Sequence, residues 1–476
     1  MVLAEKGKRW LYEKDGWKKL GLFAVCLVFY LAFPLFDGPY WSKDSTSYAT
    51  MDITREPLYP TFLWLFRNWF GEEGYLMPVI LFQALLAAYA AWKLAVTVKE
   101  KKGSFALGCT AAGFQFAVAL LNRFVANRGS SYTVCIMTEG VGFSLYVLFI
   151  VQLYLFVLER RKRNLLGVFF YAALLASLRK QMLLTLCLMV AVFILYYLVK
   201  KRELGKLAVL LVLTGVLLAG VKTADCFYNY RVRGVWMEHS GNSMGVLCTL
   251  VYTAQDKDVE LFRDGTPKQL YEEIYARSKE ADYNISDAPK DWVGLTSHYA
   301  DCYDDIGYGI INPVVQGYIR ENQSVSPVDD TLLYDAYCGS MMKTLLGQDK
   351  GRLLRIVVWN TWKGFVNSIA RVHPVLNLYA VIMYLLYVVL YVRVVRRKGC
   401  WSRPDETATL AEIVIIGLAF NCGVVGITIF TQPRYMIYSM GLFYCALTVL
   451  LYDAVWVGRK KDAESGGRSV KVTGVR

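Results

Sequence analysis

The sequence predicts an all-α polytopic membrane protein with about ten transmembrane helices, and three observations support this fold class. Hydrophobic residues make up 55% of the 476 residues, and the mean hydropathy is +0.33. Charged residues make up 19%, below the roughly 25% of a soluble domain. The charges gather in short clusters between apolar runs that are long enough to cross a bilayer. Since the net charge of +14 lies in those clusters, where it sets topology, nucleic acid is not an expected partner.

Ten apolar runs are the candidate transmembrane helices. The first follows a Lys-rich N-terminus and has no small-residue cleavage site behind it, so we expect an uncleaved span rather than a signal peptide. The run at 165–178 is short enough for a tilted or re-entrant helix. The ten runs cover residues 21–36, 75–98, 105–121, 134–158, 165–178, 182–199, 207–221, 375–394, 408–430 and 435–457.

The basic clusters between these runs predict the orientation of the chain. They fall on alternate sides of the spans, and by the positive-inside rule all of them are cytoplasmic. Both termini are then cytoplasmic, and the loops at the other ends of the spans face outward from a cell membrane, which we expect to be a bacterial plasma membrane. The clusters cover residues 6–19, 99–102, 160–163, 200–206, 393–403 and 459–461.

The chain divides into four expected regions. An N-terminal transmembrane module covers residues 1–221, and we expect amphipathic helices in its first outer loop, 37–74. Residues 222–374 are expected to form a mostly helical extracytoplasmic domain. Residues 375–457 form the C-terminal transmembrane helices, and residues 458–476 form a polar cytoplasmic tail that we expect to be disordered.

Cysteine and histidine usage leaves the cofactors unknown. The outer domain contains four cysteines, which permit one or two disulfides, and free thiols are an equal alternative. No Cys-x-x-Cys pair or histidine cluster predicts a zinc site, although the requirement for a divalent metal stays open. The four cysteines are Cys226, Cys248, Cys302 and Cys338.

The first outer loop carries ionisable groups at the membrane edge, where such groups are costly and need a reason. Asp44 could act as a general base beside a lipid-anchored donor, and Asp52 follows at a spacing that, on a helix, would put both carboxylates on nearly one face. Tyr48 could stack on a sugar or hydrogen-bond to Asp44. Arg55 could hold a phosphate or pair with the next residue, and Tyr59 lies in the Pro-Leu-Tyr-Pro segment that follows. An ordinary solvated loop is the alternative for either aspartate, and a tyrosine of the interfacial belt is the alternative for Tyr48.

Cationic side chains at the outer ends of later spans break the positive-inside pattern. Arg179 and Lys180 lie between two apolar runs, and Arg434 precedes Tyr435 at the start of the last span. Snorkelling toward the interface is one explanation. An anionic ligand such as a polyprenyl phosphate or diphosphate is another. Glu139 begins an apolar run on the same side, where a lone carboxylate usually faces protein or a cavity, so these groups together predict one outward-facing cavity.

In these segments the chain resembles the GT-C membrane glycosyltransferases, a superfamily that includes protein O-mannosyltransferases and the lipid A aminoarabinose transferase. The typical first outer loop of the family carries an Asp-Glu-x-x-Tyr-like motif and then a Pro-rich Pro-Leu-Tyr stretch. Residues 44–48 match the aspartate and the tyrosine, with Ser45 in place of the second acidic residue, and residues 55–60 match the second element. Residues 434–435 resemble the Arg-Tyr element that opens the last helices.

The resemblance implies a sugar donor linked to polyprenyl phosphate, inversion at the anomeric carbon, and a cell-surface glycan, lipid or protein as acceptor. Asp44 would be the base on the acceptor hydroxyl, Arg179 and Arg434 would hold the donor phosphate, and Arg55 would line the cavity. Where a mechanism needs a second acid, Asp52 could take the place of the residue that Ser45 replaces.

Two other functions stay open. A flippase or transporter of lipid-linked saccharides would show related halves and interrupted midplane helices, and the sequence has no such symmetry. A glycan polymerase or ligase that uses diphosphate-linked lipids would share the outward arginines and the large outer loop, but it does not need an acidic residue in the first loop. An extracytoplasmic glycosyltransferase that works among membrane lipids therefore explains the most features.

Overall fold

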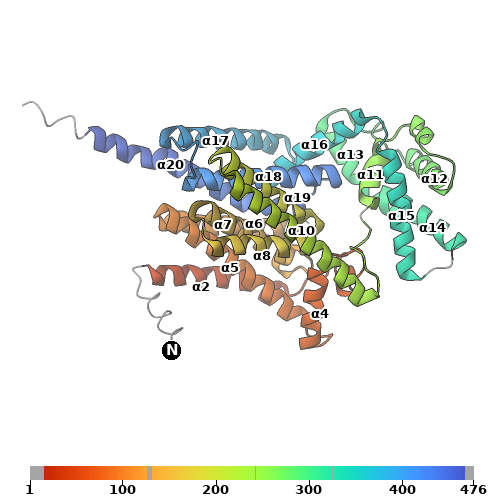
Figure 1. Cartoon of the computed structure of the whole chain (residues 1–476), viewed down its shortest axis with the longest axis horizontal. Helices are drawn as coiled ribbons and strands as arrows, with labels where there is room; N and C mark the ends of the chain where they lie inside the picture. The colour runs from red at the N-terminus through yellow and green to blue at the C-terminus, as the bar shows by residue number, and fades with distance from the viewer. Residues whose placement is uncertain (1–14, 126–130, 242, 324–325, 467–476) are drawn as a thin grey trace, which may run out of the picture.

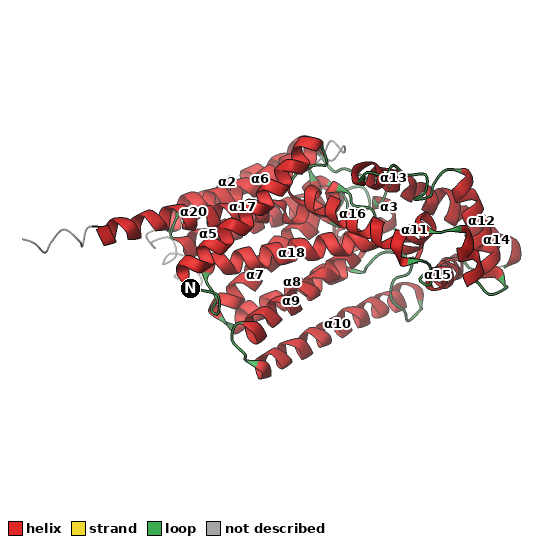
Figure 2. Cartoon of the chain, turned by 90° about the horizontal axis from the view of Figure 1, so that it is seen from above, coloured by secondary structure: helices red, strands yellow, loops and turns green. Residues whose placement is uncertain are grey.

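The computed structural model describes residues 15–125, 131–241, 243–323 and 326–466, and within these ranges the chain is all-α (Figure 1, Figure 2). Short 3-10 and π segments occur among the α-helices. The β-type pairing in the described part is limited to an isolated bridge between Tyr40 and Cys135. The expected fold class is confirmed.

Nine helical segments of the described chain are long and apolar enough to cross a membrane, and they coincide with nine of the ten expected runs. The tenth run lies in α8 (Lys162–Leu178), which has 17 residues and packs against α7 and α10. The nine spans are α2 (Gly16–Asp37), α5 (Leu76–Lys102), α6 (Phe105–Val125), α7 (Glu139–Glu159), the segment Lys180–Val199, α10 (Leu204–Arg233), α17 (Pro374–Lys398), α18 (Glu406–Thr428) and the segment Pro433–Val455.

Local sequence signals set the ends of the last spans. Pro374 begins α17 at a position where its missing N–H leaves no hydrogen bond unmade. Gly399 ends the helix with a φ of 56°, in the left-handed region that glycine adopts without strain. Asp405 caps α18 by accepting hydrogen bonds from the first backbone N–H groups of that helix.

Several elements extend beyond or break within their expected ranges. α10 has 30 residues and continues past the run expected at 207–221. The final helix runs to Gly466 and so includes part of the tail that the sequence places from residue 458; residues 467–476 lie outside the described residues. Two spans are composite: η2 (Lys180–Leu183), α9 (Leu184–Phe193) and η3 (Ile194–Val199) form one, and α19 (Pro433–Met436), η6 (Ile437–Ser439) and α20 (Met440–Gly466) form the other.

Basic residues from three of the expected cytoplasmic clusters meet at one end of the bundle. Lys102 and Lys398 both pair with Asp453, at 2.8 and 2.6 Å. Lys200 pairs with Glu412 at 2.7 Å. Both carboxylates are buried. The pairs with Asp453 tie the ends of α5 and α17 to the last helix, and the pair with Glu412 ties the end of the segment Lys180–Val199 to α18.

A second apolar core lies at the other end of the bundle, among α11 to α16 (Figure 1). Tyr271 is fully buried in it. The four cysteines of the outer region, Cys226, Cys248, Cys302 and Cys338, are free thiols. The elements of this core are α11 (Ser243–Thr253), η4 (Asp256–Leu261), α12 (Thr266–Glu280), α13 (Trp292–Asp304), η5 (Asp305–Ile311), α14 (Asn312–Asn322), α15 (Pro327–Leu345) and α16 (Lys350–Ile369).

Candidate active site

The first outer loop forms two helices separated by a turn. α3 (Ser45–Ala49) begins directly after Asp44, and α4 (Leu58–Phe70) follows the turn. Met51 in the turn has a φ of 58°, a left-handed conformation that a continuing α-helix does not contain. Asp44 and Asp52 therefore do not share a helical face, which corrects the expectation drawn from their spacing.

Hydrogen bonds fix α3 to the segment that precedes α7. The Tyr40 N–H donates to the Val134 carbonyl at 2.8 Å, and the Ile136 N–H donates back to the Tyr40 carbonyl at 3.0 Å. Ser45 is fully buried, and its Oγ donates to the Ile136 carbonyl at 2.9 Å. Ser45, which stands in place of the second acidic residue of the family motif, therefore anchors the loop and sets the position of the neighbouring Asp44.

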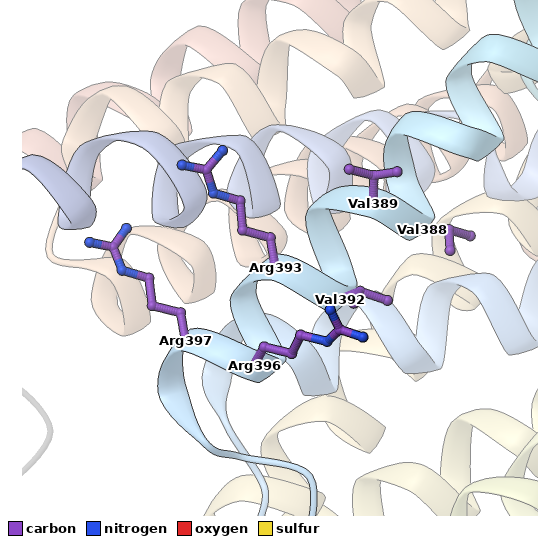
Figure 3. A pocket seen from close by; sticks show the side chains of 6 residues that line it. All are labelled: Val388, Val389, Val392, Arg393, Arg396 and Arg397. Carbon is purple, nitrogen blue, oxygen red and sulfur yellow. The ribbon is translucent and has the colours of Figure 1, made fainter.

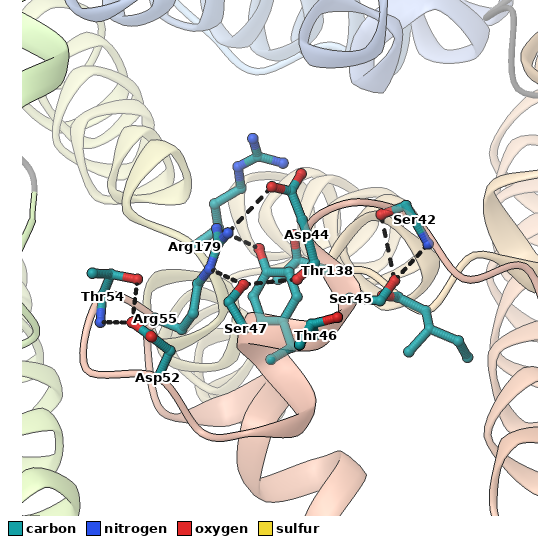
Figure 4. Close-up of polar contacts among 12 residues, drawn as sticks. Ser42, Asp44, Ser45, Thr46, Ser47, Asp52, Thr54, Arg55, Thr138 and Arg179 are labelled. Atoms are coloured by element: carbon teal, nitrogen blue, oxygen red, sulfur yellow. Dashed lines mark hydrogen bonds and ion pairs between the residues drawn. The ribbon is translucent and has the colours of Figure 1, made fainter. Parts of the chain in front are cut away.

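Asp44 lies between two arginines that are far apart in the sequence. Arg55 Nη2 is 3.2 Å from Asp44 Oδ1, and Arg434 Nη1 is 3.4 Å from Asp44 Oδ2. The contact with Arg55 is visible in Figure 4. Since the Asp44 side chain is 35% exposed, its carboxylate is both oriented by the arginines and accessible to a ligand.

Arg55 is itself held by two residues of α3. Its Nε donates to Ser47 Oγ at 2.8 Å, and its guanidinium lies 4.5 Å from the centre of the Tyr48 ring. Burial raises the pKa of the Tyr48 phenol, and the charge of Arg55 opposes that shift. Tyr48 is buried, and its ring packs against the guanidinium of Arg55. Ser47, which accepts a hydrogen bond from Arg55, is a residue that the sequence analysis did not single out.

A chain of contacts joins Glu139, Arg179 and Arg434 through one tyrosine ring. Arg179 Nη1 donates to Glu139 Oε1 at 2.7 Å. The guanidinium of Arg179 lies 4.8 Å from the centre of the Tyr435 ring, and that of Arg434 lies 4.7 Å from the same ring. Arg434 Nη2 also donates to the Tyr435 hydroxyl at 2.6 Å. The structure therefore brings together four of the residues expected from the outer ends of separate spans.

An apolar cavity of about 340 Å³ adjoins Arg434. Its walls come from α6, α16, α17 and the last span, and they include Leu376, Met440 and Tyr444. Arg434 Nε is buried and has no hydrogen-bond partner among the described residues. A buried guanidinium with an unused donor at the mouth of an apolar cavity is suited to an amphiphile with an anionic head.

Three other expected site residues lie elsewhere in the same region. Asp52 Oδ1 accepts hydrogen bonds from the Thr54 N–H at 2.8 Å and from the Thr54 Oγ1 at 2.6 Å, and Figure 4 shows it directed toward Thr54. Tyr59 is fully buried, with its hydroxyl donating to Gln83 Oε1 at 2.9 Å. Lys180 is exposed, and its backbone N–H donates to Glu56. The structure does not bring Asp52, Tyr59 or the Lys180 side chain into contact with Asp44.

A buried histidine connects this loop to the end of α10. His239 Nδ1 is 2.5 Å from Asp225 Oδ2, and His239 Nε2 is 3.8 Å from Glu56 Oε1. Burial alone lowers the pKa of His239, but the hydrogen bond to Asp225 and the charges of Glu56 and Asp225 outweigh it, so that the pKa is raised. The backbone N–H of Ser240 also donates to the Ile53 carbonyl at 3.0 Å.

The outer helices contribute two polar residues that the sequence did not single out. Asp304 ends α13, and Tyr308 lies in the π-helical η5 that follows. Burial raises the pKa of Asp304; Arg434 lowers it, whereas Asp44 raises it further. Both Asp44 and Arg55 also act on the pKa of Tyr308. The charges of Asp44 and its arginine neighbours therefore reach both Asp304 and Tyr308, and π-helical turns are frequent at functional sites.

No group of three His, Cys, Asp or Glu side chains that could hold a metal ion occurs in the described part of the chain. The site instead consists of one accessible carboxylate, three arginines and a buried glutamate. Positive charge exceeds negative charge among these five groups, and one end of the set meets an apolar cavity. The arrangement can bind an anion and can accept a proton from a neutral group beside it.

No family model matches the chain, and no curated protein sequence matches it. Among solved structures, the chain is similar to the crystal structure of ArnT from Cupriavidus metallidurans bound to undecaprenyl phosphate. The match covers 97% of this chain and 82% of that chain, with 14% sequence identity and a TM-score of 0.30. This score reflects a poor overall superposition, so nothing about the function of this chain follows from the match.

Proposed function

We propose that the chain is an extracytoplasmic glycosyltransferase of GT-C type. It would move a sugar from a polyprenyl-phosphate-linked donor to a cell-surface acceptor, with inversion and with Asp44 as the general base. The proposal places both termini and the basic end of the bundle in the cytoplasm, and the Asp44 site on the outer face of a cell membrane. The acceptor is a hydroxyl group on a glycan, a lipid or a protein.

The observation that carries the proposal is the position of Arg434. This arginine contacts the accessible carboxylate of Asp44, and it also lines the apolar cavity between membrane-length helices. A lipid phosphate has the matching form, with an apolar chain for the cavity and an anionic head for the arginine. The carboxylate would then lie beside the bond between the phosphate and the sugar.

The proposed reaction is one displacement at the anomeric carbon. The acceptor hydroxyl gives its proton to the Asp44 carboxylate while its oxygen bonds to the anomeric carbon. The bond from that carbon to the phosphate oxygen breaks, and polyprenyl phosphate leaves with one more negative charge than it had in the donor. Arg434 and Arg179 supply positive charge where this negative charge develops. Attack opposite the leaving group inverts the configuration.

Donor binding would change the partner of Arg434. Its contact with Asp44, at 3.4 Å, is longer than the 2.7 Å contact between Arg179 and Glu139, and its Nε is unpaired. A donor phosphate that enters along the cavity would therefore draw Arg434 away from Asp44 more easily than it would separate Arg179 from Glu139. Asp44 would keep Arg55 as its orienting partner, and the carboxylate oxygen that Arg434 leaves would be open to the acceptor hydroxyl.

The test is an assay of the purified protein with a panel of polyprenyl-phosphate sugars and a mixture of cell-envelope acceptors. We expect release of polyprenyl phosphate with at least one donor, and a fall of about 10²- to 10³-fold in Arg434→Gln. Arg67→Gln is a matched control, since Arg67 lies on α4 and pairs with Glu72 at 3.6 Å. Movement of the lipid-linked sugar across a vesicle membrane without release of polyprenyl phosphate would instead indicate a flippase. Turnover confined to diphosphate-linked donors would indicate a polymerase or ligase.

A further inference from the structure

A second basic site lies at the end of the bundle opposite Asp44. Arg393, Arg396 and Arg397 project from the last turns of α17 beside an open hollow of about 790 Å³ (Figure 3). The same hollow is lined by Val388, Val389 and Val392. The three arginines have a spacing of three and four residues, which puts them on neighbouring positions of one helical surface.

These arginines differ from three lysines at this end in having no carboxylate partner among the described residues. Lys102, Lys200 and Lys398 each pair with a buried carboxylate of the bundle. Within the described residues, Arg393 and Arg396 form no ion pair, and all three arginines are exposed. Arg397 makes one long contact, from Nη1 to the Ala454 carbonyl at 3.5 Å. Three guanidinium groups are therefore available to an external anion.

The apolar part of the hollow lies deeper along the same helix. Val388 and Val389 are exposed, and only 17% of the most apolar window of α17 is buried inside the protein. Since a helix rises by about 1.5 Å per residue, Val388 lies about 13 Å from Arg397 along the axis. That separation matches the step from a lipid headgroup to the upper part of its acyl chains.

We propose that this hollow binds an anionic glycerophospholipid of the inner leaflet, with the headgroup phosphate on Arg393, Arg396 and Arg397 and an acyl chain along Val388, Val389 and Val392. Charge complementarity selects an anionic over a zwitterionic lipid. Because the site is at the other end of the bundle from Asp44, this lipid is distinct from the proposed sugar donor. The inference does not depend on the proposed reaction, and its assignment to the inner leaflet follows the orientation proposed above.

Native mass spectrometry of the full chain in detergent tests the site. Phosphatidylglycerol is titrated in parallel with phosphatidylcholine of the same acyl chains. We expect wild type to bind phosphatidylglycerol more tightly, and the variant R393Q/R396Q/R397Q to bind it at least about tenfold more weakly. Binding of phosphatidylcholine should be the same in both proteins.

The variant R161Q/K162Q/R163Q is the matched control. It removes the same charge from the same end of the bundle, but its residues are consecutive and so point to different sides of α8. Its binding of phosphatidylglycerol should stay within about twofold of wild type. A second variant, R393K/R396K/R397K, keeps the charge and should retain most of the binding. Equal losses in the two glutamine variants, or no preference of wild type for phosphatidylglycerol, would overturn the proposal.

Discussion

The carboxylate of Asp44 is accessible to solvent and is also held in place by its neighbours. Two arginines hold its two carboxylate oxygens, yet about a third of the side chain is exposed. Glu139 is the opposite case, since it is buried and has one close cationic partner, Arg179. The two carboxylates at this site are therefore suited to different tasks: Asp44 to contact with substrate, and Glu139 to the placement of Arg179.

The Glu139–Arg179 pair leads to a stability prediction. Glu139→Gln leaves the guanidinium of Arg179 without its carboxylate partner in a buried setting, which typically costs about 3–5 kcal/mol. We expect a clear fall in the thermal unfolding midpoint in detergent. The double variant Glu139→Gln with Arg179→Met removes both charges and should recover part of the lost stability. A single variant as stable as wild type would show that the pair is not buried as described.

A second prediction for a single residue concerns Asp304. Because the pKa of the Asp304 carboxyl group responds to the charges of Asp44 and Arg434, we expect Asp304→Asn to raise the KM for the acceptor by about tenfold, the effect of losing roughly one charged hydrogen bond. Release of sugar from the donor to water should change little. Asp305→Asn is the control, since Asp305 is turned to the Tyr283 hydroxyl at 3.2 Å. The same KM in wild type and Asp304→Asn would remove Asp304 from the acceptor site.

The elements of the bundle followed from apolar length and the positions of charged clusters, and this is why nine of the expected runs became membrane-length helices. The structure of the loop between α2 and α5 was predicted less well from the sequence. The spacing of Asp44 and Asp52 suggested one helix, but the chain turns at Met51 and directs Asp52 to Thr54. The Asp52 N–H donates to the Ser47 carbonyl at 2.9 Å within this turn, and the Ser240 N–H, far away in the sequence, donates to the Ile53 carbonyl at 3.0 Å. Helical periodicity alone could not reveal such a turn.

In the charged site, too, some residues could be predicted from the sequence and others could not. Arg179 and Arg434 could be singled out because they lie at the span ends that are expected to face outward, where cations break a simple topological rule. Asp304 and Tyr308 could not, because one acidic residue among many in a polar region has no local signal. Their role depends on how the outer helices pack on the bundle, and the π-helical turn at η5 becomes visible only in the structure.

His239 predicts a pH dependence of the link between α10 and the first loop. The groups that face it are Asp225, Glu56 and Lys180. Its pKa in the folded protein is raised above the usual 6.5 or so. A raised pKa means that the folded state binds the proton more tightly, so this stabilisation is complete below pH 6.5 or so and is lost as the pH rises through the folded pKa.

Thermal unfolding midpoints of wild type and His239→Gln between pH 5.5 and 9 measure this effect. We expect the difference between the two proteins to be largest at low pH and to shrink as the pH rises. His373→Gln is the control, since His373 is exposed at the start of α17. A difference that is constant across the pH range would contradict the protonated link.

The molecule as a whole has two chemically different ends. One end holds the basic clusters and the carboxylates that pair with them, and the other holds the Asp44 site and the outer helices. The charged groups differ as well: at the basic end the buried carboxylates of Asp453 and Glu412 pair with lysines and hold helices together, whereas at the other end Arg434 keeps an unused donor beside a cavity. This polarity underlies the orientation that we propose.

Cysteine labelling in intact cells tests the orientation. Asp264→Cys lies in the loop between η4 and α12, where the Asp264 side chain is 97% exposed, and Ser402→Cys lies in the loop between α17 and α18. In a background with the native cysteines removed, we expect a membrane-impermeant maleimide to label Asp264→Cys in intact cells and Ser402→Cys only after permeabilisation. The reverse pattern would place the Asp44 site in the cytoplasm.

The most direct test of the account compares Asp44→Asn with Asp52→Asn in transfer from a polyprenyl-phosphate sugar that wild type turns over. Both variants remove one carboxylate from the same loop, but only Asp44 contacts Arg55 and Arg434. We expect turnover to fall by about 10²- to 10⁴-fold in Asp44→Asn, the usual effect of losing a general base, and to stay within a few-fold of wild type in Asp52→Asn. Equal turnover in wild type and Asp44→Asn, with both proteins folded, would contradict the account.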